Sequence, residues 1–132
     1  MRNIYIAYSI TNAQKTTDAI FELVYWLRKR KYKVTTPTLI LIPDTLAENA
    51  VNAIINADIV IADLSNYSHG VGFELGYAYA LKKKIITVAN ARSANTISLF
   101  MNGLFPRTIY YTDANNLIEN VSKIKLINGK NN

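Results

Sequence analysis

The chain has 132 residues, of which half are hydrophobic and 18% are charged. This length is typical of one domain, and the composition excludes a disordered chain. The chain contains no cysteine, which excludes disulfides and thiolate metal sites, and its one histidine, His69, excludes a metal cage of several histidines. We therefore expect a single domain over residues 1–132 that folds on one core without metal or disulfides.

The net charge is +6, which fits a nucleic acid, an anionic membrane or a small anionic ligand. The basic residues gather at 28–33 and 82–84, where we expect helices to end and where cations stabilise the helix dipole. This interpretation is favoured over a nucleic-acid surface, because no aromatic residues alternate with these basic ones. No apolar run reaches the about 20 residues of a membrane span, and the first residues lack a signal-peptide layout. We therefore expect a cytoplasmic protein that binds neither nucleic acid nor a membrane.

Strand and helix patterns alternate along the chain. Residues 3–8 (NIYIAY) predict a strand, and the near-continuous apolar run at 58–62 (DIVIA) predicts a strand buried on both faces. Apolar residues at helical spacing separate such runs. The predicted elements in chain order are strand 3–8, a helix carrying Ile20 to Leu27, strand 32–36, a helix carrying Leu46 to Ile55, strand 58–62, helix 71–81, strand 85–88, helix 97–102, strand 108–111 and helix 113–123.

Cap-type residues and prolines mark the connections. Ser9, Thr11 and Asn12 precede the first helix, and Asp44 and Thr45 are expected to cap the second one. We also expect an apolar loop at 37–43 and a frayed tail at 128–132.

Five strands that alternate with helices predict a doubly wound parallel sheet, flavodoxin-like (Rossmann-like), with the strand order 2-1-3-4-5. Ligands of such sheets bind beyond the carboxyl ends of the strands, at the switch point that strands one and three flank here. We therefore expect the site to be built from loops 9–12 and 63–72 and from the region after residue 88.

The segment 57–81 carries the residues best suited to chemistry. Gly70 and Gly72 allow unusual backbone torsions and close approach at a helix start, where free N–H groups favour an anion. Ser68 adds a hydroxyl donor. Glu74 is a lone carboxylate in an apolar helix, either a first-turn partner of the helix dipole or a working group, and the residue pattern alone favours neither.

The whole segment resembles the nucleoside 2-deoxyribosyltransferase superfamily. The mark of that superfamily is an Ala-Asp pair at the start of a strand, a loop, and the motif G-x-G-[FYM]-E-L-G-x-A. Here Ala57-Asp58 is followed by GVGFELGYA at 70–78. The likeness extends over nearly the full chain, and it implies a single deoxyribosyltransferase-like domain.

Three serines make the chain more similar, within that superfamily, to the 2'-deoxynucleoside 5'-monophosphate N-hydrolases. The first loop contains Ser9-Ile10, as it does in these hydrolases. Ser68 stands where they have a phosphate-binding serine and the transferases an aspartate. Ser98 matches a second phosphate-binding serine, supplied by the neighbouring subunit, where the transferases have asparagine. A serine hydroxyl can donate to a phosphate that an aspartate would repel.

The resemblance implies a homodimer, without cofactor or metal, that hydrolyses a small deoxynucleotide to free base and deoxyribose 5-phosphate. Glu74 would stabilise or attack C1' of the sugar. Tyr5 would orient Glu74 through a hydrogen bond, although a tyrosine in a central strand is also an ordinary core residue. The expected substrate-binding residues are Ser9, Ile10, Asp63, Ser68, Gly70, Gly72 and Ser98.

One position departs from the family pattern. The family carries an aspartate on the second helix that contacts the sugar and assists the leaving base, and Ala50 aligns there. Glu48, Asp63 or Asp44 could substitute, or catalysis could be weakened or lost. Two alternatives stay open: a nucleoside 2-deoxyribosyltransferase that passes the sugar to a second base, and a nucleotide-binding module that has lost turnover. His69 is either a phosphate or base contact or an exposed loop histidine.

Overall fold

The computed structural model describes residues 2–10, 14–37 and 44–128. The cap-type residues Thr11 and Asn12 lie outside the described residues. So do the predicted apolar loop, apart from residue 37, and the predicted frayed tail, apart from residue 128. All strand pairs are parallel, and the sheet has the predicted order β2-β1-β3-β4-β5. The strands are β1 (Asn3–Ala7), β2 (Lys33–Thr35), β3 (Ile59–Asp63), β4 (Lys84–Asn90) and β5 (Ile109–Tyr111).

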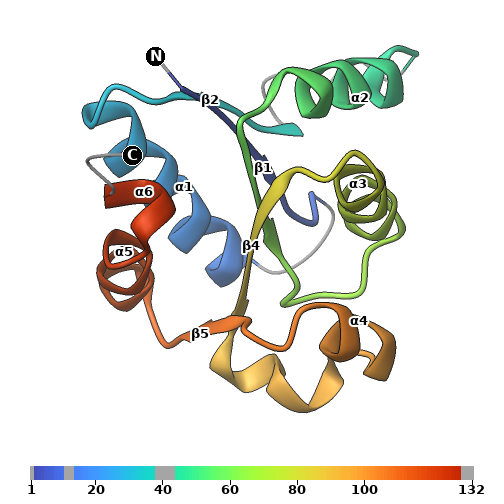
Figure 1. Ribbon diagram of the computed structural model, residues 1–132. Helices are drawn as coiled ribbons and strands as arrows, with labels where there is room; N and C mark the ends of the chain where they lie inside the picture. The colour runs from blue at the N-terminus through green and yellow to red at the C-terminus, as the bar shows by residue number, and fades with distance from the viewer. Residues whose placement is uncertain (1, 11–13, 38–43, 129–132) are drawn as a thin grey trace.

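Helices cover both faces of this sheet (Figure 1). One face carries α1 (Gln14–Lys29), α5 (Ala114–Ser122) and α6 (Lys125–Asn128), and the other carries α2 (Leu46–Asn56), α3 (His69–Ala80) and α4 (Leu99–Leu104). A 3-10 helix, η2 (Ala91–Thr96), follows β4. Within the described part of the chain, no helix is long and apolar enough to cross a membrane.

The alternation of side chains along β1 divides the core in two. Ile4 and Ile6 pack in the cluster with α1 and α5, whereas Tyr5 and Ala7 pack in the cluster with α2 and α3. Successive side chains of a strand point to opposite faces of the sheet. Tyr5 is therefore placed under α3, the helix that carries Glu74.

Helix α3 begins at His69, two residues before the predicted start, because the Ser68 side chain caps it by accepting a hydrogen bond from Val71 N at 3.2 Å. Gly70 therefore lies inside the helix, and no described glycine has a positive φ. The unusual backbone torsions that Gly70 and Gly72 would allow are therefore not adopted. A Cβ at Gly72 would meet nothing within 4 Å, so this glycine borders open space.

Glu74 is the sixth residue of α3 and thus lies beyond the first turn. Of the two alternatives that the sequence left open for Glu74, the first-turn partner of the helix dipole is therefore excluded, because that interaction falls off within the first turn. The helix dipole therefore does not explain why this apolar helix carries a carboxylate.

Two other helix starts differ from expectation in their details. Thr45 is the N-cap residue of α2, but its hydroxyl accepts from the Asn49 side-chain amide at 3.1 Å instead of from a backbone N–H. Helix α4 begins after Ser98, whose hydroxyl accepts from Met101 N at 3.1 Å, so it starts two residues later than predicted.

Both basic clusters lie at helix ends, as predicted. Arg28 and Lys29 form the last turn of α1. Lys31 and Lys82, with φ of 72° and 59°, adopt the left-handed conformation just after α1 and α3, a common way for a helix to end.

Candidate active site

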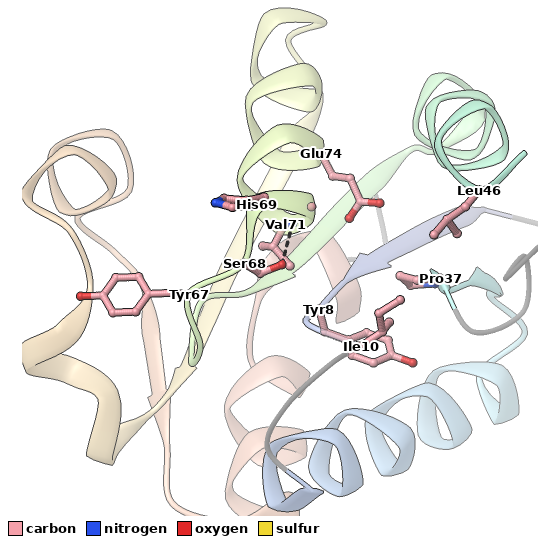
Figure 2. A pocket seen from close by; sticks show the side chains of 10 residues that line it. Tyr8, Ile10, Pro37, Leu46, Tyr67, Ser68, His69, Val71 and Glu74 are labelled. Carbon is pink, nitrogen blue, oxygen red and sulfur yellow. Dashed lines mark hydrogen bonds between the residues drawn. The ribbon is translucent and has the colours of Figure 1, made fainter. Parts of the chain in front are cut away.

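A cavity of about 560 Å³ opens where the chain leaves β1 and β2 and enters α2 and α3. This volume is within the range of small-molecule sites. The cavity lies beside the carboxyl end of β1, close to the predicted switch point (Figure 2). Its lining residues are Tyr8, Ile10, Pro37, Leu46, Tyr67, Ser68, His69, Gly70, Val71 and Glu74.

Glu74 is held in this cavity by Tyr5. The Tyr5 hydroxyl donates a 2.7 Å hydrogen bond to Glu74 Oε2, and Tyr5 itself is fully buried. Burial raises the pKa of Glu74, and the hydrogen bond from Tyr5 opposes that rise. Burial and the charge of Glu74 both raise the pKa of Tyr5, which therefore stays a neutral donor. Figure 2 shows the Glu74 carboxyl group directed into the cavity, so the pair supplies one oriented carboxylate.

The start of α3 forms the polar end of the cavity. Ser68 Oγ accepts from Val71 N, and its own hydrogen can still be donated to a ligand. Gly70 lines the same end, and the backbone N–H groups of a helix start favour an anion. Ser9 stands between Tyr8 and Ile10 in the sequence, but its side chain is buried and does not line the cavity.

Ser98 lies away from the Glu74 cavity of its own chain. Its side chain is exposed and lines a second, smaller cavity of about 120 Å³ between the starts of α3 and α4, together with Ser68 and Gly72. Within one chain, the structure therefore places Ser68 at both cavities but Ser98 at the smaller one alone.

Asp63 lies outside the cavity, in a buried network. One carboxyl oxygen accepts from Ser65 N at 3.0 Å and from Ser65 Oγ at 2.6 Å, and the other accepts from the Tyr111 hydroxyl at 3.3 Å. Ser65 Oγ in turn accepts from Asn90 N at 2.7 Å. These bonds tie the loop that leads to Ser68 to the ends of β4 and β5.

This network predicts a pH-dependent stability. Burial raises the pKa of Asp63 from 3.8 to about 6, against the opposing hydrogen bonds from Ser65 and Tyr111. The folded chain thus binds this proton more tightly than the unfolded chain, which favours folding fully below about pH 4. As the pH rises from below about 4 to above about 6, the free energy of unfolding falls by on the order of 3 kcal/mol.

Asp63→Asn is expected to remove this fall, because an amide can accept from Ser65 and donate to Tyr111 at any pH. Urea unfolding of both proteins at several values between pH 4 and pH 7 measures the difference. Parallel pH profiles would show that Asp63 titrates alike in the folded and unfolded chains.

Helix α2 faces the cavity through Leu46, and Ala50 follows one turn later in the buried cluster that contains Tyr5. Ala50 itself does not line the cavity, so its predicted place beside the sugar stays a prediction. Glu48 and Asp44, the acids nearest in sequence, are exposed and do not line the cavity.

His69, which the sequence offered either as a ligand contact or as an exposed loop histidine, lines the cavity. Its ring is exposed and is directed away from the Glu74 carboxyl group in Figure 2.

Several other cavity residues were not foreseen from the sequence. Tyr8 ends one predicted strand and Pro37 directly follows another, and this position at the carboxyl end of a strand is the signal that could have identified them. Leu46 and Tyr67 carry no such signal.

These features define a doubly wound α/β protein with an oriented carboxylate in a ligand-sized cavity at the carboxyl edge of its sheet. The family model of nucleoside 2-deoxyribosyltransferases matches residues 4–122, and the chain belongs to this family.

Named relatives agree with this membership. A Thermofilum pendens protein, provisionally named a 2'-deoxynucleoside 5'-phosphate N-hydrolase, is 23% identical over 92% of this chain and 93% of its own length. The 5-hydroxymethyl-dUMP N-hydrolase of Rattus norvegicus is 38% identical over 56 residues, which are 42% of this chain and 34% of that protein. The CMP N-glycosidase of Clostridium botulinum shares the fold, with a TM-score of 0.72 and 20% identity over 91% of this chain and 99% of its own. Family and names together support an enzyme with N-glycosidase or deoxyribosyltransferase activity.

Proposed function

We propose that the protein hydrolyses the N-glycosidic bond of 2'-deoxynucleoside 5'-monophosphates to free base and deoxyribose 5-phosphate. The observation that carries this proposal is the buried Glu74 carboxyl group, held by Tyr5 at 2.7 Å in a cavity that the start of α3 also lines. The names of two relatives, both N-hydrolases of deoxynucleotides, support the choice of substrate.

The chemistry needs one carboxylate beside C1' of the sugar. As the bond to the base breaks, positive charge develops at C1', and the Glu74 carboxylate stabilises this charge or attacks to form a glycosyl-enzyme. Tyr5 acts as a positioning residue, because its hydroxyl fixes Oε2 of Glu74. Water then releases the sugar phosphate.

The phosphate is assigned to the start of α3. Ser68 can donate its hydroxyl hydrogen, and Gly70 allows close approach to backbone N–H groups. An aspartate at position 68 would repel the same phosphate, which favours the hydrolase over a nucleoside transferase. Release of base from monophosphates, compared with the matching nucleosides, tests this assignment.

We also propose that the enzyme is a homodimer in which Ser98 completes the phosphate site of the partner. Ser98 is exposed, and it is followed by Leu99 and Phe100, which are 90% and 72% exposed. Adjacent exposed apolar side chains of this size are typical of an interface.

Ala50→Asp is expected to raise the rate of base release at least tenfold. The new carboxyl group would enter the buried cluster that contains Tyr5, whose hydroxyl binds Glu74, and two close carboxylates cannot both ionise freely. One would hold a proton near neutral pH and pass it to the leaving base, and general acid catalysis contributes about 10²–10⁴-fold.

Single-turnover release of base, with thermal unfolding measured in parallel, checks this result. A modest loss of stability is expected, because a polar group replaces a buried methyl. Ala47→Asp, on the exposed side of α2, is the matched control and should leave the rate unchanged. An unchanged rate in folded Ala50→Asp would mean that another group already protonates the base.

A further inference from the structure

The cavity wall on the side of α2 is hydrocarbon. Leu46 from α2, Pro37 after β2 and Ile10 after β1 line it. Figure 2 shows the Glu74 carboxyl group directed from α3 toward this side. The side chains of Leu46, Pro37 and Ile10 offer only carbon atoms to the space in front of the carboxylate, and Tyr8 beside Ile10 adds one hydroxyl group.

This wall continues behind the lining residues. Ala50, one turn beyond Leu46 on α2, is buried among apolar side chains. Residues 11–13 (TNA) and 38–43 (TLILIP) lie outside the described part of the chain, and their sequence contains no titratable side chain. A proton for the base would have to come from elsewhere in the cavity or from water.

A wall of this kind restricts the bases that can leave. The electron pair of the broken bond passes to the base, so an ordinary purine or pyrimidine departs as an anion unless it receives a proton. A bare anion is costly beside hydrocarbon and close to a carboxylate. A base that already carries a positive charge departs as a neutral molecule and avoids both costs.

We propose that this site is adapted to nucleotides with a cationic base, such as an N-alkylated purine or a pyridinium ring, whose departure needs no general acid. This inference rests on the proposed function and specifies its leaving group. The Glu74 carboxylate attracts such a base before the reaction.

The reaction balances without an added proton. A Glu74 carboxylate oxygen bonds to C1' while the bond from C1' to the base nitrogen breaks, and its electron pair neutralises the cationic base. Water then attacks C1', the carboxylate leaves, and one proton passes to solvent. The products are the neutral base and deoxyribose 5-phosphate.

The experiment compares 2'-deoxyguanosine 5'-monophosphate with its N7-methyl derivative, in which the methyl group supplies the charge that a proton would otherwise supply. Base release from each is measured for the unmodified protein and for Ala50→Asp, with Glu74→Gln as the control for both. The intrinsic difference in reactivity between the two nucleotides is the same for both proteins. The rate increase that Ala50→Asp causes for one nucleotide, divided by its rate increase for the other, therefore measures the effect of the added acid.

We expect Ala50→Asp to accelerate the unmethylated nucleotide at least tenfold and the methylated one by less than about threefold. The same comparison uses 2'-deoxycytidine 5'-monophosphate and its N3-methyl cation if the cavity rejects purines. Equal acceleration of both nucleotides, or none of either, would overturn this inference while Glu74-dependent release still upheld the proposed function. Loss of the unmethylated reaction alone in His69→Gln would also overturn it, because His69 would then be the acid. Absence of release from all four nucleotides would refute both.

Discussion

Glu74→Gln is expected to lower the rate of base release by at least about three orders of magnitude. Glutamine keeps the size of the side chain and can still accept from Tyr5, but it lacks the charge that stabilises or attacks C1'. Losses of this size are typical when an essential group of covalent catalysis is removed. Single-turnover assays with a saturating monophosphate give the rate directly.

Two control measurements show whether a loss of rate comes from the Glu74 carboxylate and not from a general effect of the substitution or from unfolding. Glu22→Gln, an exposed change on α1, should leave the rate unchanged. Thermal unfolding of Glu74→Gln should match or exceed that of the unmodified protein, since burial already disfavours the charge of Glu74. Near-normal turnover in folded Glu74→Gln would remove this carboxylate from the mechanism.

Ser68→Asp is expected to raise the KM for monophosphates about ten- to a hundredfold or more, with little effect on any reaction of nucleosides. The loss of one charge-assisted hydrogen bond contributes roughly 1.5–3 kcal/mol, and repulsion between carboxylate and phosphate adds to it. Aspartate is also a good N-cap, so α3 should keep its start.

Steady-state kinetics of three variants separate binding from folding. Ser68→Thr keeps the hydroxyl and should stay close to the unmodified protein. Ser68→Ala loses both the hydroxyl and the cap to Val71 N, and should raise KM while lowering stability by about 1 kcal/mol. If Ser68→Asp and Ser68→Thr had the same KM for monophosphates, the phosphate would bind elsewhere.

The sheet was predictable because its determinants are local. Continuous apolar runs such as residues 58–62 mark strands that are buried on both faces, and short helices between them leave few possible topologies. The observed strand order confirms this prediction. The period of two along β1 also places Tyr5 on the face that α3 covers.

The details of helix starts and of buried polar groups were not predictable, because they depend on three-dimensional contacts. Ser68 begins α3 earlier than the glycines suggested, since its side chain caps the helix. Asp63 follows β3 at a favoured ligand position, yet its carboxyl group binds Ser65 and Tyr111, the second of which is 48 residues away. No spacing rule in the sequence connects residues so distant.

The most direct test of the central claim is the release of free base and deoxyribose 5-phosphate from a panel of 2'-deoxynucleoside 5'-monophosphates and the matching nucleosides, for the unmodified protein and for Glu74→Gln. The account predicts that the two products form in equal amounts from at least one monophosphate, faster than from its nucleoside, and that Glu74→Gln abolishes both. Faster reaction of the nucleosides, or release that is unchanged by Glu74→Gln, would contradict it.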